Sequence, residues 1–373
     1  MSGFRRATQA DRPAWEAFVA ARPEADPLQS WAWGEANAIA GEVPVRGLVE
    51  TGAGAITAVA QVLVRPAGFG RTVGYVPHGP VWTREADDAD PVLDALLAGI
   101  RILGGERRAI VVKIDPRAGA GRPAPDRPIA GEPAAVNPAA GSPDAFRDAL
   151  ARRDLRVARH DLQAPTTRIV NLLDGGDALL ATFDKDARNL IRRSAREGVV
   201  TETDRTGDAV AVAAFHNLLE TTSSRAGFRI RSIAFLETLA HELATSGGWY
   251  LTIARLGDRS IAGAVALRVG DRAIYTYGAS LREPALKHAN GAYAALASTM
   301  RTLAEDGCRT LDLWGVVKPG DDTTDPSWQG FSAFKRQFGG LEVRHPGTFD
   351  LVVSPVWDRI RETRERIAGA VGR

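Results

Sequence analysis

The sequence contains one cysteine, Cys308, among 373 residues. A single cysteine excludes an intramolecular disulfide and any cysteine-based metal cluster, and this scarcity is typical of a reducing cytoplasm. We expect Cys308 to be a small buried apolar residue. The six histidines show no metal-ligand spacing with one another or with Cys308, and no Walker loop or dinucleotide-binding glycine fingerprint follows a strand. The sequence therefore predicts neither a metal site nor a bound dinucleotide.

Long apolar runs are also missing. Nowhere do about 18 apolar residues follow one another, and residues 1–12 are polar and charged, unlike a signal peptide. We therefore expect a soluble protein of the cytoplasm. The net charge is only +2, so contact with nucleic acid or lipid would depend on local patches of charge.

One order of predicted elements occurs twice, about 200 residues apart, which is typical of a duplicated domain. A chain of 373 residues with 45% hydrophobic composition is long enough for two cores. Each copy has three strands joined by glycine-containing turns, then a helix and a further strand. In the first copy these are residues 43–50, 55–64, 71–76, 91–103 and 109–114, and in the second 249–255, 260–269, 272–277, 290–305 and 309–314.

Three antiparallel strands, a helix and a strand parallel to the third are the core order of the GNAT acyltransferase fold. We therefore predict an α/β (α+β) protein with two tandem GNAT-like domains. Domain 1 would comprise residues 1–158 and 341–373, and domain 2 residues 159–340. Residues 117–143, rich in Ala, Gly and Pro, are predicted to form a long surface loop. No coiled-coil heptads interrupt the second domain, so no helical arm is expected.

Residues 329–340 place Lys335 between two phenylalanines and end in two glycines. One interpretation is a cation held against apolar walls, where water is scarce and its field acts strongly on an anion. The other is that Phe334 and Phe338, one helical turn apart, anchor the core while Lys335 and Arg336 point into solvent. This segment alone does not decide between the two.

A predicted helix over residues 184–197 carries cations at spacings of three and four, which places them on one face. They could contact the phosphates of a nucleic acid or a lipid carrier, or they could form a solvated face balanced by nearby carboxylates. For the arginines of the closing helix, residues 356–371, a solvated surface is the expectation. The four cations of the first helix are Lys185, Arg188, Arg192 and Arg196.

Several short motifs follow one another along nearly the whole chain. They are Gln29-Ser30 with Trp33-Gly34, Val76-Pro77-His78-Gly79-Pro80-Val81, Lys113-Ile114-Asp115-Pro116, Arg188-Asn189-Leu190-Ile191-Arg192-Arg193-Ser194-Ala195 with Gly198-Val199, Thr222 with Arg225-Ala226-Gly227-Phe228, Tyr275 and Tyr277 with Gly278-Ala279, Asp312-Leu313-Trp314-Gly315, and Phe334-Lys335 with Phe338-Gly339-Gly340. In order and spacing they resemble the FemABX peptidyltransferases, which use aminoacyl-tRNA to add amino acids to the stem peptide of peptidoglycan precursors.

The resemblance implies roles for individual residues. Lys335 matches the family's lysine that stabilises charge on the aminoacyl ester, and Phe334 matches an aromatic that shapes that site. Arg225 matches an arginine that binds phosphate. Tyr275, Tyr277 and Asp115 match positions that line the peptide channel, although Asp115 could instead cap the turn after its strand.

The tryptophan-glycine motif departs from the family pattern. Trp33 matches the substrate-binding region, but the family often has a lysine shortly afterwards that assists Arg225 on the diphosphate. The aligned residue here is Asn37, which can donate a hydrogen bond but carries no charge. Asn37 therefore makes the acceptor the least defined part of the prediction.

The function implied is an aminoacyltransferase of peptidoglycan cross-bridge formation. Aminoacyl-tRNA would be the co-substrate, no cofactor is required, and the acceptor would be UDP-MurNAc-pentapeptide or lipid II. The protein would be a monomer, in contact with the inner face of the membrane if its acceptor is lipid-linked. No histidine base is apparent, so the substrate would supply the proton path.

Two alternatives remain open. One is an acetyl-CoA-dependent N-acetyltransferase of the same fold, although residues 287–293 have Asn290 where that site needs its first glycine and residues 85–90 are mostly acidic. The other is a non-catalytic protein that binds precursor or tRNA, which Asn37 favours and intact Lys335 and Arg225 oppose.

Overall fold

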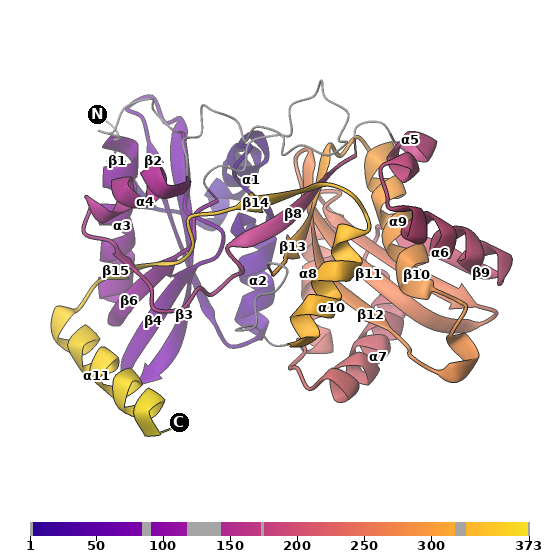
Figure 1. Cartoon of the computed structure of the whole chain (residues 1–373). Helices are drawn as coiled ribbons and strands as arrows, with labels where there is room; N and C mark the ends of the chain where they lie inside the picture. The colour runs from indigo at the N-terminus through magenta and orange to yellow at the C-terminus, as the bar shows by residue number, and fades with distance from the viewer. Residues whose placement is uncertain (1–2, 84–90, 118–142, 173–174, 318–325, 372–373) are drawn as a thin grey trace. The chain divides into compact units, whose positions relative to one another are not determined.

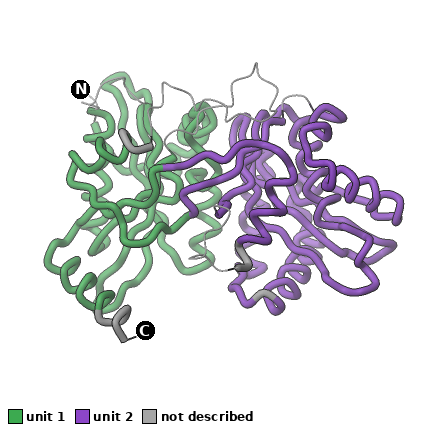
Figure 2. Tube along the Cα trace, viewed as in Figure 1, with its two compact units in different colours: residues 1–118, 141–163, 346–373 green, residues 119–140, 164–345 purple. Residues whose placement is uncertain are grey.

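The computed structural model describes residues 3–83, 91–117, 143–172, 175–317 and 326–371 (Figure 1). The chain forms two compact units (Figure 2). Unit 1 comprises residues 1–118, 141–163 and 346–373, and unit 2 comprises residues 119–140 and 164–345. The sequence placed the two crossovers at residues 158 and 340. Nearly all of the predicted loop 117–143 lies outside the described residues.

The sheet of unit 1 has the order β1-β2-β3-β4-β6-β15-β7, with β5 paired to β3. Strands β2 (Val43–Glu50), β3 (Ile56–Gly68) and β4 (Arg71–Val76) are antiparallel. Helix α3 (Pro91–Glu106) then leads to β6 (Ala109–Ile114), which is parallel to β4. The short strands are β1 (Gly3–Arg6), β5 (Val81–Trp82), β7 (Arg156–Val157) and β15 (Phe349–Val352).

Helix α3 covers one face of this sheet, and α1 (Arg12–Ala21) and α2 (Trp31–Ile39) cover the other (Figure 1). Leu96 and Ile100 of α3 pack on Val62 and Val112 of the strands, all fully buried. The remaining helices of the unit are α4 (Pro143–Ala151) and α11 (Pro355–Val371). Strand β7 ends at Val157, and beyond it the chain makes isolated loop contacts, such as that of the Ala158 amide with the Thr348 carbonyl.

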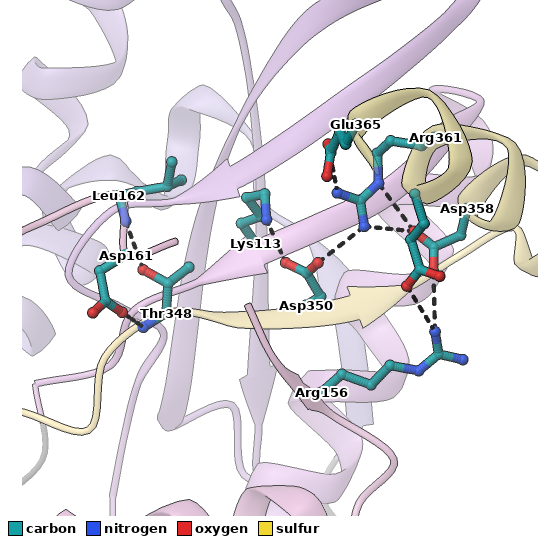
Figure 3. Close-up of polar contacts among 10 residues, drawn as sticks. Lys113, Arg156, Asp161, Leu162, Thr348, Asp350, Asp358, Arg361 and Glu365 are labelled. Carbon is teal, nitrogen blue, oxygen red and sulfur yellow. Dashed lines mark hydrogen bonds and ion pairs between the residues drawn. The ribbon is translucent and has the colours of Figure 1, made fainter. Parts of the chain in front are cut away.

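The C-terminal segment, residues 346–373, is part of unit 1, and its strand β15 lies between β6 and β7. Ion pairs connect this segment to the rest of the unit (Figure 3). Lys113 Nζ lies 2.5 Å from Asp350 Oδ1. Arg361 of α11 reaches both Asp350 and Asp358, at 3.0 and 2.6 Å, and Arg156 also contacts Asp358. Most of these groups are buried or half-buried, so the segment is held as an integral part of the unit.

Unit 2 repeats the core order of unit 1 in a sheet ordered β14-β8-β13-β12-β11-β10-β9. Strands β10 (Trp249–Leu256), β11 (Arg259–Val269) and β12 (Arg272–Ser280) are antiparallel, and α9 (Gly291–Glu305) leads to β13 (Thr310–Gly315), parallel to β12. The predicted duplication of a GNAT-like core is therefore confirmed. The remaining strands are β8 (Thr166–Asn171), β9 (Val199–Asp204) and β14 (Leu341–Arg344).

Helix α9 packs on the strands of unit 2 through a core that includes Tyr250, Leu296 and Met300. Two long helices that the sequence reading missed, α7 (Ala209–Ala226) and α8 (Ile233–Ala244), pack beside the sheet as well. Helices α5 (Gly176–Ala181), α6 (Lys185–Arg196) and α10 (Pro326–Arg336) complete the unit. Within the described ranges, no helix has the length and apolar character needed to cross a membrane.

Candidate active site

The ammonium group of Lys335 is enclosed within unit 2. Lys335 lies in the last turn of α10, is 7% exposed, and donates a hydrogen bond of 2.7 Å to the Gly315 carbonyl. Its Nζ lies 5.9 Å from the centre of the Phe331 ring. The interpretation in which Lys335 points into solvent is therefore wrong. An ammonium has three donors, so the Gly315 carbonyl leaves two for a ligand.

Burial weakens the hold of Lys335 on its proton. Removal from water lowers the pKa of Lys335 to about 8, while the nearby Asp312 carboxylate acts in the opposite direction. Among the residues that the structure describes, none forms an ion pair with Lys335. At pH 7 the Lys335 ammonium is then mostly protonated, and no described residue neutralises its charge in an ion pair.

An irregularity in β13 sets the position of the Gly315 carbonyl. Pairing with β8 shifts register between Asp312 and Gly315. Between them Trp314 has φ of 66°, a conformation that is rare for a bulky residue. Asp312 Oδ1 accepts a 2.7 Å hydrogen bond from the Trp314 amide, which holds this conformation. The strained segment therefore presents its carbonyl to Lys335.

Aromatic rings form the surroundings of α10. Phe338 is fully buried and belongs to the core, as one interpretation of the sequence predicted. Phe334 is half-buried, and its ring centre lies 5.1 Å from that of Phe338 and 5.0 Å from that of Tyr293. Tyr293 donates a 2.9 Å hydrogen bond to Gln337. Phe334 is thus held edge-on to its neighbours, next to Lys335 in the chain.

Arg225 lies at the exposed C-terminal end of α7. Its guanidinium donates to the Ser280 carbonyl at the end of β12, at 3.1 Å, and Thr222 accepts from the Ser280 amide at 3.2 Å. Partial burial and repulsion from Arg282 lower the pKa of Arg225. Repulsion between two guanidinium groups means that this corner of the unit carries excess positive charge, which suits an anionic ligand.

The two tyrosines of β12 have different surroundings. Pairing of β11 with β12 shifts register between Val265 and Ala266, opposite the tyrosines. Tyr275 lies in the core cluster beneath α9, where burial raises its pKa. Burial also raises the pKa of Tyr277, to about 12, against a hydrogen bond from Arg231. Of the two tyrosines, Tyr277 is therefore the one that contacts a cation, Arg231, in the segment after α7.

Asp115 lies in unit 1 at the end of β6, within a buried polar cluster. It accepts hydrogen bonds from Tyr75 Oη, at 2.6 Å, and from the His78 amide. Burial raises the pKa of Asp115 to about 6. Asp26 contacts His78 Nδ1 and lies 3.6 Å from Arg117. Asp115 thus holds the loop after β4.

Sequence reasoning missed three members of this cluster. Asp26, His78 and Arg117 are each less than 8% exposed. His78 was part of a quoted motif but was assigned no role, and the paired carboxylate lies 52 residues away. Only their burial, which local patterning does not reveal, shows that they belong together.

Trp33 and Asn37 lie inside unit 1 on α2. Trp33 is 6% exposed and Asn37 only 1%. The Asn37 side-chain amide donates to the Trp33 carbonyl at 2.7 Å, one helical turn back. A side chain that binds a phosphate must reach the protein surface, and the Asn37 side chain is buried.

The basic face of α6 is mostly exposed. Lys185, Arg192 and Arg196 are exposed, whereas Arg188 is half-buried and donates at 2.9 Å to two backbone carbonyls at the end of α5. Arg193, beside this face, lies 3.7 Å from Glu197. Three cations therefore remain available on one helix face for a polyanion, and Arg188 has a structural role.

Three other chemistries can be compared with the described residues: metal binding, thiol chemistry and coenzyme A binding. In the described part of the chain, no three His, Cys, Asp or Glu side chains are placed to hold a metal ion. Cys308 is buried, and burial raises its pKa to about 11, so its thiol is unreactive. Helix α9 begins after Asn290, whose φ of 49° is left-handed. Residues 85–90, the other segment considered for coenzyme A, lie outside the described residues.

Comparisons with known proteins agree on the class of fold and reaction. The model of the acetyltransferase (GNAT) domain family matches residues 181–336. A lipid II:glycine glycyltransferase of Staphylococcus aureus (strain MRSA252) is 22% identical, with 95% of each chain aligned.

Solved structures show the same two-unit fold. The crystal structure of FemX has a TM-score of 0.77 at 20% identity, covering 96% of this chain and 99% of FemX. A tandem GNAT protein from the clavulanic acid biosynthesis pathway has a TM-score of 0.51 at 13% identity, covering 95% and 99%. The chain is therefore similar to FemABX-type acyltransferases over nearly its whole length, and it has the fold of two GNAT-like domains.

Proposed function

We propose that the protein transfers an amino acid from aminoacyl-tRNA to the stem-peptide amine of a peptidoglycan precursor, building the interpeptide bridge. The relatives that align over 95% of the chain are named lipid II:glycine glycyltransferases, which supports a precursor of this class as the acceptor. The observation that carries the proposal is the buried ammonium of Lys335, which donates to the Gly315 carbonyl.

The reaction is aminolysis of an ester. The neutral amine of the stem peptide attacks the ester carbonyl carbon, a new C–N bond forms, and the carbonyl oxygen becomes anionic. The C–O bond to the tRNA ribose then breaks, and the ribose hydroxyl leaves with a proton that originates on the amine. A donor aimed at the developing oxyanion accelerates such a step by about 10²- to 10³-fold. Lys335 supplies this donor.

The remaining candidate residues bind and orient the substrates. Arg225, beside Arg282 in a corner of positive charge, holds a phosphate of the precursor. Tyr277, hydrogen-bonded to Arg231, lines the path of the peptide. Lys185, Arg192 and Arg196 on the exposed face of α6 contact the phosphates of tRNA.

A second candidate, transfer of acetyl from acetyl-CoA, is favoured by the family model that matches residues 181–336. It requires backbone amides at a helix N-terminus to hold the pyrophosphate. Helix α9 begins with Gly291, and the residue before it is Asn290 in a left-handed conformation. Asn290, where a coenzyme A site needs its first glycine, favours the tRNA donor.

A transfer assay separates the two donors. Purified protein is incubated with a mixture of charged tRNAs and either lipid II or UDP-MurNAc-pentapeptide, with acetyl-CoA as a parallel donor, and products are weighed by mass spectrometry. We expect the acceptor to gain one amino-acid residue, and the gain to disappear after RNase treatment. Gain of an acetyl group would establish the second candidate. No gain with any donor would favour the non-catalytic alternative.

A further inference from the structure

A groove of about 310 Å³ lies in unit 1, away from the residues assigned above. One wall is the tip of the β3–β4 hairpin, residues 67–69, and the other is α11, with Ile110 between them. Figure 1 shows α11 beside this hairpin. We call these walls, together with the adjoining turn at residues 107–108, the hairpin–helix surface. The Thr72 amide donates to the Arg108 carbonyl, which attaches that turn to the hairpin.

Large apolar side chains project from this surface into solvent. Phe69 at the hairpin tip is 71% exposed, and Val356 and Ile360, one turn apart on α11, are 69% and 43% exposed. A surface Phe adjoining two exposed aliphatic residues and an open groove is a sizeable apolar feature for a protein of balanced charge. It has no role in the chemistry proposed for unit 2.

Arginines surround the apolar side chains. Arg364 lies over the Phe69 ring at 5.0 Å, and Arg71 lies over the Trp357 ring at 4.7 Å. In the described residues, neither Arg359 nor Arg364 forms an ion pair. Exposed Arg65 and Arg108 also form none there.

The acidic groups of the same region are already paired. On α11 the carboxylates of Asp358 and Glu365 pair with Arg361, and that of Glu362 lies 3.8 Å from Arg366. Glu106, the last residue of α3, pairs with Arg6. The charge left over at this surface is therefore positive, and it borders exposed apolar side chains.

We propose that the hairpin–helix surface docks the protein on an anionic phospholipid bilayer. Phe69, Val356 and Ile360 enter the headgroup region, while Arg359 and Arg364 lie against lipid phosphates. An apolar face bordered by arginine is the arrangement that peripheral proteins use to bind such surfaces. The inference rests on the proposed function in one respect, since a lipid-linked acceptor gives membrane docking its purpose.

A bilayer fits these features better than the other polyanions or a second protein. RNA would be expected at a cationic face without large apolar groups, as on α6. A second copy of this chain would bring the same uncompensated arginines together, and that contact would be repulsive. An anionic bilayer alone matches both the positive charge and the exposed aliphatic side chains.

Vesicle sedimentation of the full chain tests the proposal without any substrate. The vesicles contain either phosphatidylglycerol with phosphatidylcholine or phosphatidylcholine alone. Each arginine near an anionic surface contributes about fivefold to binding, so Arg359→Gln with Arg364→Gln should weaken it about 25-fold. Phe69→Ser should weaken it about tenfold. Two matched controls leave the surface intact: Arg159→Gln with Arg301→Gln removes the same charge from exposed sites elsewhere, and Val210→Ser removes a side chain that is 74% exposed.

We expect selective binding to anionic vesicles that both surface variants lose and both controls keep. The proposal would be overturned if the protein did not bind vesicles, or if the control variants lost as much vesicle binding as the surface variants. It would also be overturned if the protein self-associated or bound RNA through this surface, so that Phe69→Ser abolished that binding. Transfer assays distinguish failure of the surface from failure of the reaction. If the surface is right, its variants slow transfer to lipid II in vesicles but not to UDP-MurNAc-pentapeptide. If the proposed reaction is wrong, transfer fails with both acceptors while vesicle binding persists.

Discussion

Replacing Lys335 with methionine removes the ammonium and keeps an unbranched side chain of similar length. The loss of one donor to the oxyanion should lower kcat by about 10²- to 10³-fold, or about 3 to 4 kcal/mol in activation free energy. KM for the precursor should change little, because the interaction strengthens only as charge develops on the ester oxygen.

The effect of Lys335→Met on stability follows from its burial. Lowering of the lysine pKa from 10.5 to about 8 corresponds to about 3 kcal/mol of destabilisation of the folded protein when the group is charged. Methionine removes this term. It also leaves the Gly315 carbonyl without its partner, which costs about 1–3 kcal/mol. The two terms nearly cancel, so the free energy of unfolding at pH 7 should stay within about 2 kcal/mol of wild type.

The assay combines initial rates of transfer with urea unfolding of the same preparations. Wild-type stability should also rise between pH 8 and 10.5 relative to Lys335→Met, because there the unfolded lysine binds a proton that the folded one has released. A fall in kcat of less than tenfold would refute the catalytic role of Lys335. Loss of several kcal/mol of stability would instead assign the lysine a structural role.

Four further outcomes follow from individual contacts. In a pH–rate profile, wild-type turnover should fall above about pH 8 as Lys335 loses its proton. An active Lys335→Arg variant should not show this fall, because the guanidinium stays charged. Arg225→Ala should raise the precursor KM about tenfold or more with kcat retained, whereas Arg301→Ala, removing another exposed arginine, should not. Because the pKa of Asp115 is raised to about 6, the protonated carboxyl contributes about 3 kcal/mol to stability below pH 3.8, and this contribution is lost as pH rises through about 6. Urea unfolding at a series of pH values should show this fall in the free energy of unfolding for wild type but not for Asp115→Asn. Asp350→Ala should lower the free energy of unfolding by about 3 kcal/mol, since it removes the carboxylate partner of half-buried Lys113 and one of the three carboxylates around Arg361; an unchanged midpoint would contradict this.

The core strands could be predicted from the sequence because their ends are set by local chemistry. Strands β2 and β4 have the predicted bounds, residues 43–50 and 71–76, since glycine-containing turns separate alternating apolar segments. Helix α8 was missed although its signal was present: Ser232 caps it, and Phe235, Leu236 and Leu239 repeat at helical spacing. The short strand β7 depends on pairing with β15, almost 200 residues away, which no local pattern reveals.

The candidate site was only partly predictable for the same reason. The sequence left open whether Phe334 and Phe338 anchor the core with Lys335 in solvent, or whether Lys335 is itself enclosed. Lys335 and Phe338 are both buried, because the Gly315 carbonyl on a distorted strand provides the lysine with a partner. The buried position of Asn37 likewise depends on how α2 packs. Long-range packing therefore decided the points that composition and periodicity could not.

The central claim is that the protein moves an aminoacyl group from tRNA to a peptidoglycan precursor amine. The most direct test is a single-turnover reaction in which protein saturated with lipid II is mixed with tRNA carrying a radiolabelled amino acid, then quenched at successive times. We expect label to leave the tRNA and to appear on lipid II at the same rate. Label that remains on bound tRNA, or that is released as free amino acid while lipid II stays unlabelled, would contradict it.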